Sequence, residues 1–515
     1  MELEVKVSET MNFFRVKKHW TNYMILLILF LVTSIFSFKQ SLHWDELIYL
    51  DASTYTYIPG PENSYAFVKL GHYALLSLLV LFTGRSLNAF YALRITFAII
   101  TFSFILVVYS FAFMFMKSNR LQSLCTALIL IVSPIIIYLN ARLLAEIPSI
   151  LITLIGCFIL LLGFKKSKYH LSLVSGFVSF LGFVFRVTTL ITYVSFVISL
   201  VIVDLLSKKK SRIMKSISKS PISFLKIGNN MVWYAIGSAF TFGLSFLCWV
   251  GLYGFTPFLR FYLVAVESGM YPTYMVRING FYSSVSILNF AIELFPFVPF
   301  ALLSLIVHKK DALLKTSCLW VALSSLPIIF IISPGAYFET RQGHFNIVPL
   351  SILSAFSLAY ISKYLINHFI KNHSSARLLR YWGPYISLAM LFSIITISSF
   401  YLAAYQPNVQ WQIGDAVKVA NWVETNYPTS PIFASRDSYF LIRFCFPNLH
   451  LYRLHGDMDV NTLFSLAANK TILLWCTGTQ EERLLTEYHE GIISQNLYSS
   501  GKISIYYLCN QSTAR

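Results

Sequence analysis

The sequence predicts an α-helical polytopic membrane protein with about eleven transmembrane helices and a small C-terminal α/β extracytoplasmic domain. Hydrophobic residues form 56% of the 515-residue chain and charged residues only 12%, against about 25% charged residues in a soluble domain. Apolar runs of roughly twenty residues, the length of helix that crosses the hydrocarbon core, recur up to residue 404. From about residue 405 the composition is mixed, which indicates a folded domain outside the bilayer.

The apolar runs give the predicted spans in chain order. They lie near 21–38, 87–116, 122–139, 147–164, 171–185, 188–206, 231–252, 287–307, 316–333, 345–366 and 383–404. The first run follows basic residues, as in a signal peptide, but no small-x-small cleavage site comes after it, so we interpret it as an uncleaved anchor. We expect a multi-pass protein of the plasma (inner) membrane.

Lysine and arginine are concentrated in alternate connections between these spans. The basic groups are Arg15, Lys17 and Lys18; Lys117 and Arg120; Lys165, Lys166 and Lys168; Lys208, Lys209, Lys210, Arg212, Lys215 and Lys219; Lys309, Lys310 and Lys315; Lys371, Arg377 and Arg380. The positive-inside rule assigns these connections to the cytoplasm. The N-terminus is then cytoplasmic, and an odd number of spans places the C-terminus outside. This topology explains the net charge of +18, so we expect no nucleic-acid partner.

The chain divides by composition into a membrane domain, 1–404, and an extracytoplasmic domain, 405–515. Two outer loops, 39–86 and 253–286, are too long to be turns, and loops of that length are usually functional when they are not disordered. Within the first loop, 42–57 predicts a helix, and the apolar stretch 73–82 predicts an interfacial or re-entrant helix because it is too short to cross the membrane.

The C-terminal domain shows both helical and strand patterns. A helix is predicted over 413–426, strands over 431–434, 471–476 and 503–508, and a second helix over 480–490. Cys445, Cys476 and Cys509 lie in this domain, where one disulfide could form. Their spacing does not indicate which pair.

Charged side chains beside a membrane are costly, so those on the outer side are candidate functional residues. They are the carboxylates Asp45, Glu46 and Glu146, and the basic residues Lys69, Arg186, Arg341 and His344. Each also has an ordinary structural interpretation. Asp45 and Glu46 fit a solvated helix start, Glu146 a helical pair with Arg142, and Lys69 a side chain reaching the headgroups. The remaining three fit simple outer-loop charges, and Arg94 fits a structural partner of a buried acid.

Together these residues place carboxylates and several cations at the mouths of different spans on one side of the membrane. Glycosyl transfer from a lipid phosphate requires that combination. An acid removes a proton from the acceptor as it attacks C1 of the sugar, and cations hold the departing phosphate. The sequence contains no glycine-rich phosphate loop, Ser/His/Asp order or HExxH motif, so a soluble nucleotide donor is not indicated.

Four segments resemble the GT-C superfamily of polytopic glycosyltransferases, which includes aminoarabinose-to-lipid-A transferases and protein O-mannosyltransferases. The segments are HWDELIYLDA, FVKLGHYALLSLLVLFTGRSLNAFYALR, ARLLAEIPSILI and RQGHFNIVPL. The resemblance implies a catalytic base or metal-facing acid at Asp45, with Glu46 as the competing residue, and contact of Lys69 with the lipid phosphate. The fourth segment has no clear match to the usual tyrosine of the family. The resemblance therefore implies no precise role for Arg341 and His344.

The expected function is therefore transfer of a monosaccharide from a polyprenyl-phosphate donor to a lipid, glycan or protein acceptor at the outer membrane face. Asp45 would act as the base or orient it, Glu46 and Glu146 would support the acceptor or a metal, and Lys69, Arg186, Arg341 and His344 would bind the donor phosphate. A divalent cation, Mg or Mn, stays open, with Asp45 and Glu146 as its ligands. The alternative is a transporter or flippase of a lipid-linked sugar, although no inverted repeat is visible. A glycan polymerase or ligase is a third interpretation.

Overall fold

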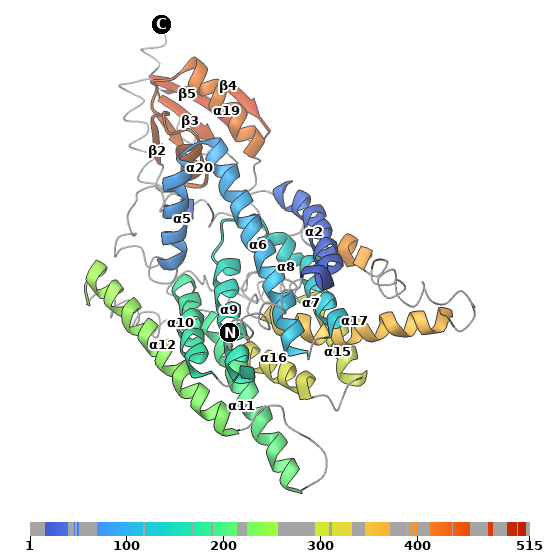
Figure 1. Cartoon of the computed structure of the whole chain (residues 1–515). Helices are drawn as coiled ribbons and strands as arrows, with labels where there is room; N and C mark the ends of the chain where they lie inside the picture. Colours follow the sequence, from blue (N-terminus) through green and yellow to red (C-terminus); the bar gives the residue numbers. More distant parts are fainter. Residues whose placement is uncertain are drawn as a thin grey trace. The chain divides into compact units, whose positions relative to one another are not determined.

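The computed structural model describes most of the chain as helices and one sheet (Figure 1). It describes residues 16–39, 46, 49–50, 70–116, 119–166, 168–186, 189–213, 224–255, 294–307, 312–331, 346–370, 389, 392–393, 395–399, 413–434, 436–453, 472–476, 492–501 and 503–510. The chain forms two compact units. Unit 1 comprises 1–38, 99–140 and 146–405, and unit 2 comprises 39–98, 141–145 and 406–515. Because unit 2 also contains 39–98 and 141–145, a domain boundary at 404/405 stays a prediction.

Unit 1 is helical. Its helices are α2 (Val16–Lys39), α7 (Arg120–Ile131), α8 (Pro134–Leu139), α9 (Glu146–Lys166), α10 (Tyr169–Phe185), α11 (Thr189–Ile213), α12 (Phe224–Tyr253), α15 (Phe297–Val307), α16 (Ala312–Ile331) and α17 (Ile347–Ile370). Helix α6 (Leu87–Phe115) begins in unit 2 and continues in unit 1. Helix α5 (Leu70–Thr83) belongs to unit 2 and confirms a helix at the predicted interfacial stretch.

The protein is a membrane protein. Among the described residues, five helical segments are long and apolar enough to cross a bilayer: His19–Phe38, Leu87–Phe115, Glu146–Lys166, Asn229–Cys248 and Ile347–Tyr364. Each predicted span up to 345–366 contains a described helix. The last predicted span, 383–404, and most of the loop 253–286 lie outside the described residues, so the count of about eleven spans stays a prediction.

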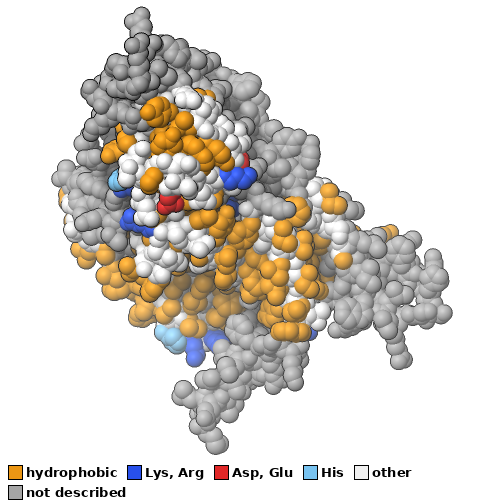
Figure 2. Space-filling view, turned by 90° about the horizontal axis from the view of Figure 1, so that it is seen from above, with side chains coloured by type: hydrophobic (Ala, Val, Ile, Leu, Met, Phe, Trp, Pro, Cys, Tyr) orange, Lys and Arg blue, Asp and Glu red, His pale blue; other side chains and the backbone are white. Residues whose placement is uncertain are grey.

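Exposed apolar side chains follow helical faces, as expected of helices that contact lipid. Hydrophobic side chains cover much of the described surface in Figure 2, and charged side chains gather in a few places. The exposed apolar residues include Ile28, Leu31 and Ile35 on α2, and Val232, Ile236 and Phe240 on α12. Their spacing of three and four residues puts each set on one side of its helix.

The predicted span 122–139 is wrong as a single helix. The structure ends α7 at Ile131 and begins α8 at Pro134. Proline has no backbone N–H and its ring disfavours helical geometry at the preceding residue, so the helix is interrupted there. Ser133 has extended geometry, and its hydroxyl accepts a hydrogen bond from the Ile136 N–H as an N-cap. The Ser-Pro pair is therefore the sequence signal for the break.

Helices α9, α10 and α12 pack closely through small residues. A Cβ atom on Gly176 of α10 would lie 2.0 Å from the Tyr234 carbonyl oxygen, and one on Gly237 of α12 would lie 2.0 Å from the Leu173 carbonyl oxygen. Only glycine therefore allows the two backbones this approach. The Ser175 hydroxyl donates to the Gly156 carbonyl oxygen of α9 at 2.7 Å. Small residues and hydroxyl hydrogen bonds are the usual means of helix association in membranes.

Helix α17 packs against α7, α15 and α16. The Ser304 hydroxyl of α15 donates to the Leu353 carbonyl oxygen of α17 at 2.6 Å. Trp320 of α16 is fully buried, and its indole N–H donates to the Thr192 carbonyl oxygen of α11 at 3.0 Å. These contacts fix α15 on α17 and one side of α16 on α11.

The C-terminal part of unit 2 contains a five-stranded mixed sheet. Its strands are β1 (Ile432–Ala434), β2 (Leu451–Arg453), β3 (Ile472–Cys476), β4 (Ile492–Ser500) and β5 (Ile503–Asn510), in the order β2-β1-β3-β5-β4. Strand β1 pairs in parallel with β2 and β3, and β5 pairs antiparallel with β3 and β4. Helix α20 (Arg436–Cys445) joins β1 to β2 as a parallel β-α-β unit.

The structure confirms several predicted elements of this region. Helix α19 (Ile413–Asn426) has the predicted bounds, and its buried residues Ala416, Val419, Ala420 and Val423 have helical spacing. It packs on β4 and β5. The predicted strands contain β1, β3 and β5. Strands β2 and β4 and helix α20 were not predicted, because β2 is three residues long and β4 (IISQNLYSS) is mostly polar. The predicted helix 480–490 lies outside the described residues.

The β4–β5 hairpin is fixed to α19 at its turn. Gly501 has a φ of +60°, and a Cβ atom there would lie 2.1 Å from a carboxylate oxygen of Asp415. The Ser500 hydroxyl donates to the other Asp415 oxygen at 2.9 Å. The turn therefore needs glycine both for its backbone conformation and for its contact with α19.

The described backbone does not fit a disulfide among the three C-terminal cysteines, which the sequence left possible. Cys445 is a free, buried thiol. Cys476 is the partner of Ser504 in the β3–β5 register, so Cys509 lies five residues further along β5. At about 3.3 Å per residue this separation is roughly 17 Å, far beyond the ~7 Å limit for the Cα atoms of a disulfide.

Candidate active site

Glu46 holds the backbone of 141–145 within unit 2. One carboxylate oxygen accepts the Leu143 N–H at 2.9 Å, and the other accepts from the Arg142 guanidinium at 3.3 Å. Both side chains of this ion pair are fully buried. A buried carboxylate is stable when a cation and hydrogen bonds compensate its charge, and Glu46 has both.

Two further side chains hold the same backbone segment. The Arg94 Nε–H donates to the Ala141 carbonyl oxygen at 2.9 Å. His72 Nε2 lies 3.1 Å from the Leu143 carbonyl oxygen, and because a carbonyl can only accept, this nitrogen carries the hydrogen. Ala141 has a φ of +59°, a left-handed conformation that costs a non-glycine residue about 1–2 kcal/mol. The hydrogen bonds that Arg94, His72 and Glu46 make to the backbone of residues 141 and 143 stabilise this conformation.

Two aromatic rings pack against the His72 imidazole. The Tyr49 ring meets it edge to face at a centroid distance of 5.0 Å, and the Phe97 ring does so at 5.8 Å. His72, Tyr49 and Arg94 are almost completely buried. Among the residues that the structure describes, the cluster brings together the guanidinium groups of Arg94 and Arg142 and the carboxylate of Glu46, and the charges of Glu46 and Arg142 both act on Arg94. Sequence reasoning missed His72. A histidine at the start of the apolar run 70–83 was the available signal.

Glu146 and Arg186 form a second buried ion pair, within unit 1. Glu146 is the first residue of α9, where a carboxylate also interacts favourably with the helix dipole. Arg186 is the C-cap of α10, and its guanidinium donates to the Glu146 carboxylate. Glu146 is fully buried and the Arg186 side chain is 7% exposed. The Thr189 hydroxyl donates to the Arg186 carbonyl oxygen at 2.7 Å and so helps to fix the turn into α11.

The two pairs differ from the local pair that the sequence suggested. Arg142 and Glu146 are four residues apart, but Arg142 precedes α9, so the two are not neighbours on one helix. Arg142 pairs with Glu46 instead, and Glu146 pairs with Arg186. The structural interpretation of Arg94 fits its position, because it lies buried in the cluster that contains Glu46.

Four predicted site residues lie outside the described residues: Asp45, Lys69, Arg341 and His344. The structure therefore describes three of the predicted residues, Glu46, Glu146 and Arg186, and each is part of a buried ion pair.

A metal site would need several ligands close together. Within the ranges that the structure describes, no three His, Cys, Asp or Glu residues are grouped in a way that could hold a metal ion. The Glu146 carboxylate already faces the Arg186 guanidinium, and a divalent cation there would have to compete with that positive charge. The described residues alone do not fit a metal, and a site that includes Asp45 stays a prediction.

Comparisons with known proteins supply the fold assignment. No protein-family model and no curated protein matches the sequence. The structure is similar to the crystal structure of ArnT from Cupriavidus metallidurans bound to undecaprenyl phosphate, with a TM-score of 0.59, 10% identity, and coverage of 96% of this chain and 98% of that one. ArnT is a GT-C glycosyltransferase. The chain has the GT-C fold.

Other solved structures extend the comparison. The apo form of the same ArnT gives a TM-score of 0.56 at 11% identity, and covers 96% of this chain and 98% of its own. The oligosaccharyltransferase of Archaeoglobus fulgidus, tethered to an acceptor peptide, gives 0.47 at 13% identity, with 93% of this chain and 69% of that chain covered. The two ArnT structures alone show that the GT-C fold spans nearly the whole sequence, which agrees with the resemblance found in its motifs.

Proposed function

We propose that this GT-C protein transfers a monosaccharide from a polyprenyl-phosphate donor to a lipid, glycan or protein acceptor at the outer face of the membrane. The observation that supports this most is the similarity to ArnT with undecaprenyl phosphate bound, over nearly the full length of both chains. A fold alone does not define an activity. The charged residues at the outer side support the substrate class.

The reaction needs one group that accepts a proton and others that hold an anion. The acceptor oxygen or nitrogen forms a bond to C1 of the sugar, and the bond from C1 to the phosphate oxygen breaks. The phosphate leaves with the electron pair, and the base takes the proton of the acceptor. A single displacement of this kind inverts the anomeric centre.

We assign the base to Asp45. Glu46 competes with it in the sequence, but the Glu46 carboxylate is buried and accepts from Arg142 and from the Leu143 N–H. A general base must reach the proton that it removes, and the Glu46 carboxylate is fully buried with both oxygens already accepting hydrogen bonds. Glu46 therefore acts by holding the segment 141–145, and its neighbour Asp45 is left for the chemistry.

We assign Arg186 to the donor phosphate, together with Lys69, Arg341 and His344. A guanidinium presents five N–H donors in a rigid fork that matches phosphate geometry. Glu146 orients this fork, because its carboxylate accepts from Arg186 in a buried position where the interaction is weakly screened. A fixed cation near the leaving group stabilises the charge that develops there.

The test is transfer of radiolabelled sugar from polyprenyl-phosphate donors by the purified chain in proteoliposomes. Asp45→Asn should lower kcat by about 10²–10⁴ as expected for loss of a general base, and Arg186→Gln should lower kcat/KM by roughly 10²–10³. Arg85→Gln is the matched control, because Arg85 is an exposed arginine between α5 and α6, and it should transfer at the wild-type rate.

A folding defect must be separated from a catalytic one. Arg186→Gln leaves the Glu146 carboxylate buried without its cation, which destabilises the fold. The double variant Glu146→Gln, Arg186→Gln removes both charges, so it should recover stability while transfer remains low. Wild-type transfer by Asp45→Asn, or by the double variant, contradicts the assignment. Label that crosses the bilayer without being transferred indicates a flippase instead.

The same assay tests for a metal. If Asp45 helps to bind Mg or Mn, a chelator should abolish transfer and one of the two ions should restore it. Full activity in chelator excludes a required exchangeable metal.

A further inference from the structure

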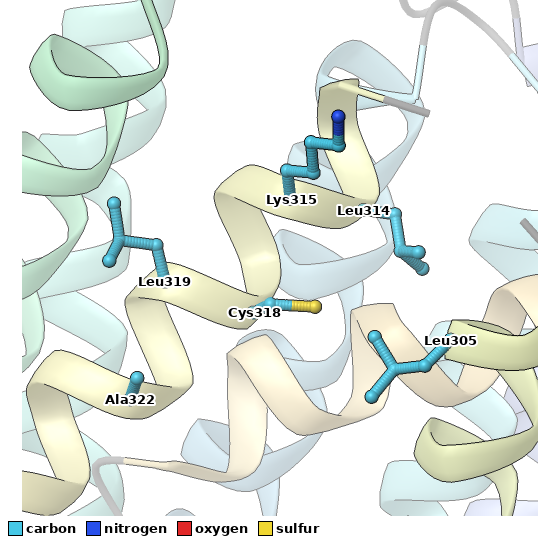
Figure 3. A pocket seen from close by; sticks show the side chains of 6 residues that line it. All are labelled: Leu305, Leu314, Lys315, Cys318, Leu319 and Ala322. Carbon is cyan, nitrogen blue, oxygen red and sulfur yellow. The ribbon is translucent and has the colours of Figure 1, made fainter. Parts of the chain in front are cut away.

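An apolar groove lies between α15 and α16 of unit 1 (Figure 3). Its volume is about 450 Å³, within the range of about 300–1,000 Å³ that is usual for ligand pockets. It is lined by Leu305 of α15 and by Leu314, Lys315, Cys318, Leu319 and Ala322 of α16. In Figure 3 the Lys315 side chain extends away from Cys318, so the one charged group lies at an end of an otherwise uncharged lining.

The packing of the helices explains why this groove is left open. Helix α17 packs against both α15 and α16. The Ser304 hydroxyl fixes α15 to α17, and the Trp320 indole fixes another side of α16 to α11. The facing side chains do not close the gap, since Leu305 is 40% exposed and Ala322 is also exposed. An apolar surface of this kind in a membrane protein is filled by an apolar chain.

We propose that the groove binds an anionic phospholipid, with an acyl chain along the apolar lining and the headgroup phosphate at Lys315. Lys315 is exposed and lies in the first turn of α16. Lys309 and Lys310 precede it in the sequence, and all three belong to a connection predicted to be cytoplasmic. Juxtamembrane lysines attract the anionic lipids of that leaflet, and a lysine ammonium binds phosphate as a point charge.

A polyprenyl phosphate has the same chemistry, an anion on a long apolar chain. We commit to the phospholipid because the proposed donor binds from the opposite face, whereas Lys315 belongs to the basic connections. The groove lies outside the proposed reaction, but the choice of a phospholipid over a polyprenyl phosphate rests on the proposed function, which puts the donor on the opposite face. A bound lipid would stabilise the packing of α15 and α16, because a ligand that binds only the folded state raises stability by mass action.

The test is native mass spectrometry of the full-length chain in detergent, titrated separately with phosphatidylglycerol, phosphatidylcholine and a polyprenyl phosphate. Phosphatidylglycerol should bind most tightly and should also raise the thermal unfolding temperature. Lys315→Gln should weaken its binding about fivefold, the equivalent of ~1 kcal/mol for one basic residue at the membrane surface. Ala322→Phe should weaken it by filling the groove.

Lys168→Gln is the matched control, since Lys168 is exposed in another connection predicted to be cytoplasmic and does not line the groove. It should bind phosphatidylglycerol as the wild type does. Equal binding of phosphatidylcholine, unchanged affinity in Lys315→Gln, or tighter binding of the polyprenyl phosphate would overturn the proposal. Lys315→Gln changes an exposed side chain, so the test stands even if Ala322→Phe does not fold.

Discussion

The substitution Glu46→Gln tests whether Glu46 stabilises the fold or acts in the chemistry. Glutamine keeps the size of the side chain, and its amide oxygen can still accept the Leu143 N–H. The negative charge is lost, and the buried Arg142 guanidinium loses the Glu46 carboxylate with which it pairs. We therefore expect a large loss of stability.

The magnitude follows from the burial of the pair. Both side chains are fully buried, and removal of one partner from a buried ion pair costs about 3–5 kcal/mol. Unit 2, which contains the pair, has a size for which 1 kcal/mol shifts the unfolding temperature by about 2–4 °C, so the expected decrease is about 6–20 °C. The double variant Glu46→Leu, Arg142→Met should recover much of this loss, because it leaves neither charge uncompensated.

The measurements are thermal unfolding in detergent and sugar transfer per folded molecule. Asp45→Asn serves as the comparison, and it should lower transfer without a matching change in unfolding temperature. Glu46→Gln should do the reverse. If Glu46→Gln unfolds within about 2 °C of the wild type but no longer transfers sugar, Glu46 acts in the chemistry and the structural role is refuted.

Two further predictions concern packing and thiol reactivity. Gly237→Val should lower the free energy of unfolding by about 1–3 kcal/mol or more, because its Cβ would meet the Leu173 carbonyl oxygen. Gly243→Val in the same helix is the control, since its Cβ has open space. An equal loss of stability in both variants would contradict this packing. Burial raises the pKa of the Cys445 thiol to about 12, so little of it is thiolate at pH 8. A maleimide at pH 8 should therefore label Cys445 only after denaturation, which peptide mass spectrometry can measure. Labelling of the native protein at pH 8 would argue against that burial.

The predictable part of the fold is the part that depends on local pattern. Helix α19 has a buried face of regular spacing, and its bounds agree with the prediction. The break between α7 and α8 could have been read from Ser133–Pro134, but the hydropathy window averaged over it. Strand β4 has a polar sequence because it is paired only with β5 at the edge of the sheet, so its hydrophobic signal is weak.

The candidate site was less predictable because its contacts join distant parts of the chain. The sequence identified Glu46, Glu146 and Arg186 as unusual charges, since burial near a membrane is costly. It could not give their partners. Glu46 and Arg142 are 96 residues apart, and Glu146 and Arg186 are 40 apart, and both pairings depend on tertiary packing. The roles of Asp45, Lys69, Arg341 and His344 stay predictions.

The discontinuity of unit 2 constrains how the protein is made. Residues 39–98 and 141–145 belong to the same unit as 406–515, although 146–405 separate them in the chain. At about 5–20 residues per second, the ribosome needs roughly 20–70 s to reach residue 515 after residue 145 has been added. During this time the early segments lack the C-terminal part of their unit. A chain truncated before residue 406 would leave these early segments permanently without the part of unit 2 that contains the sheet.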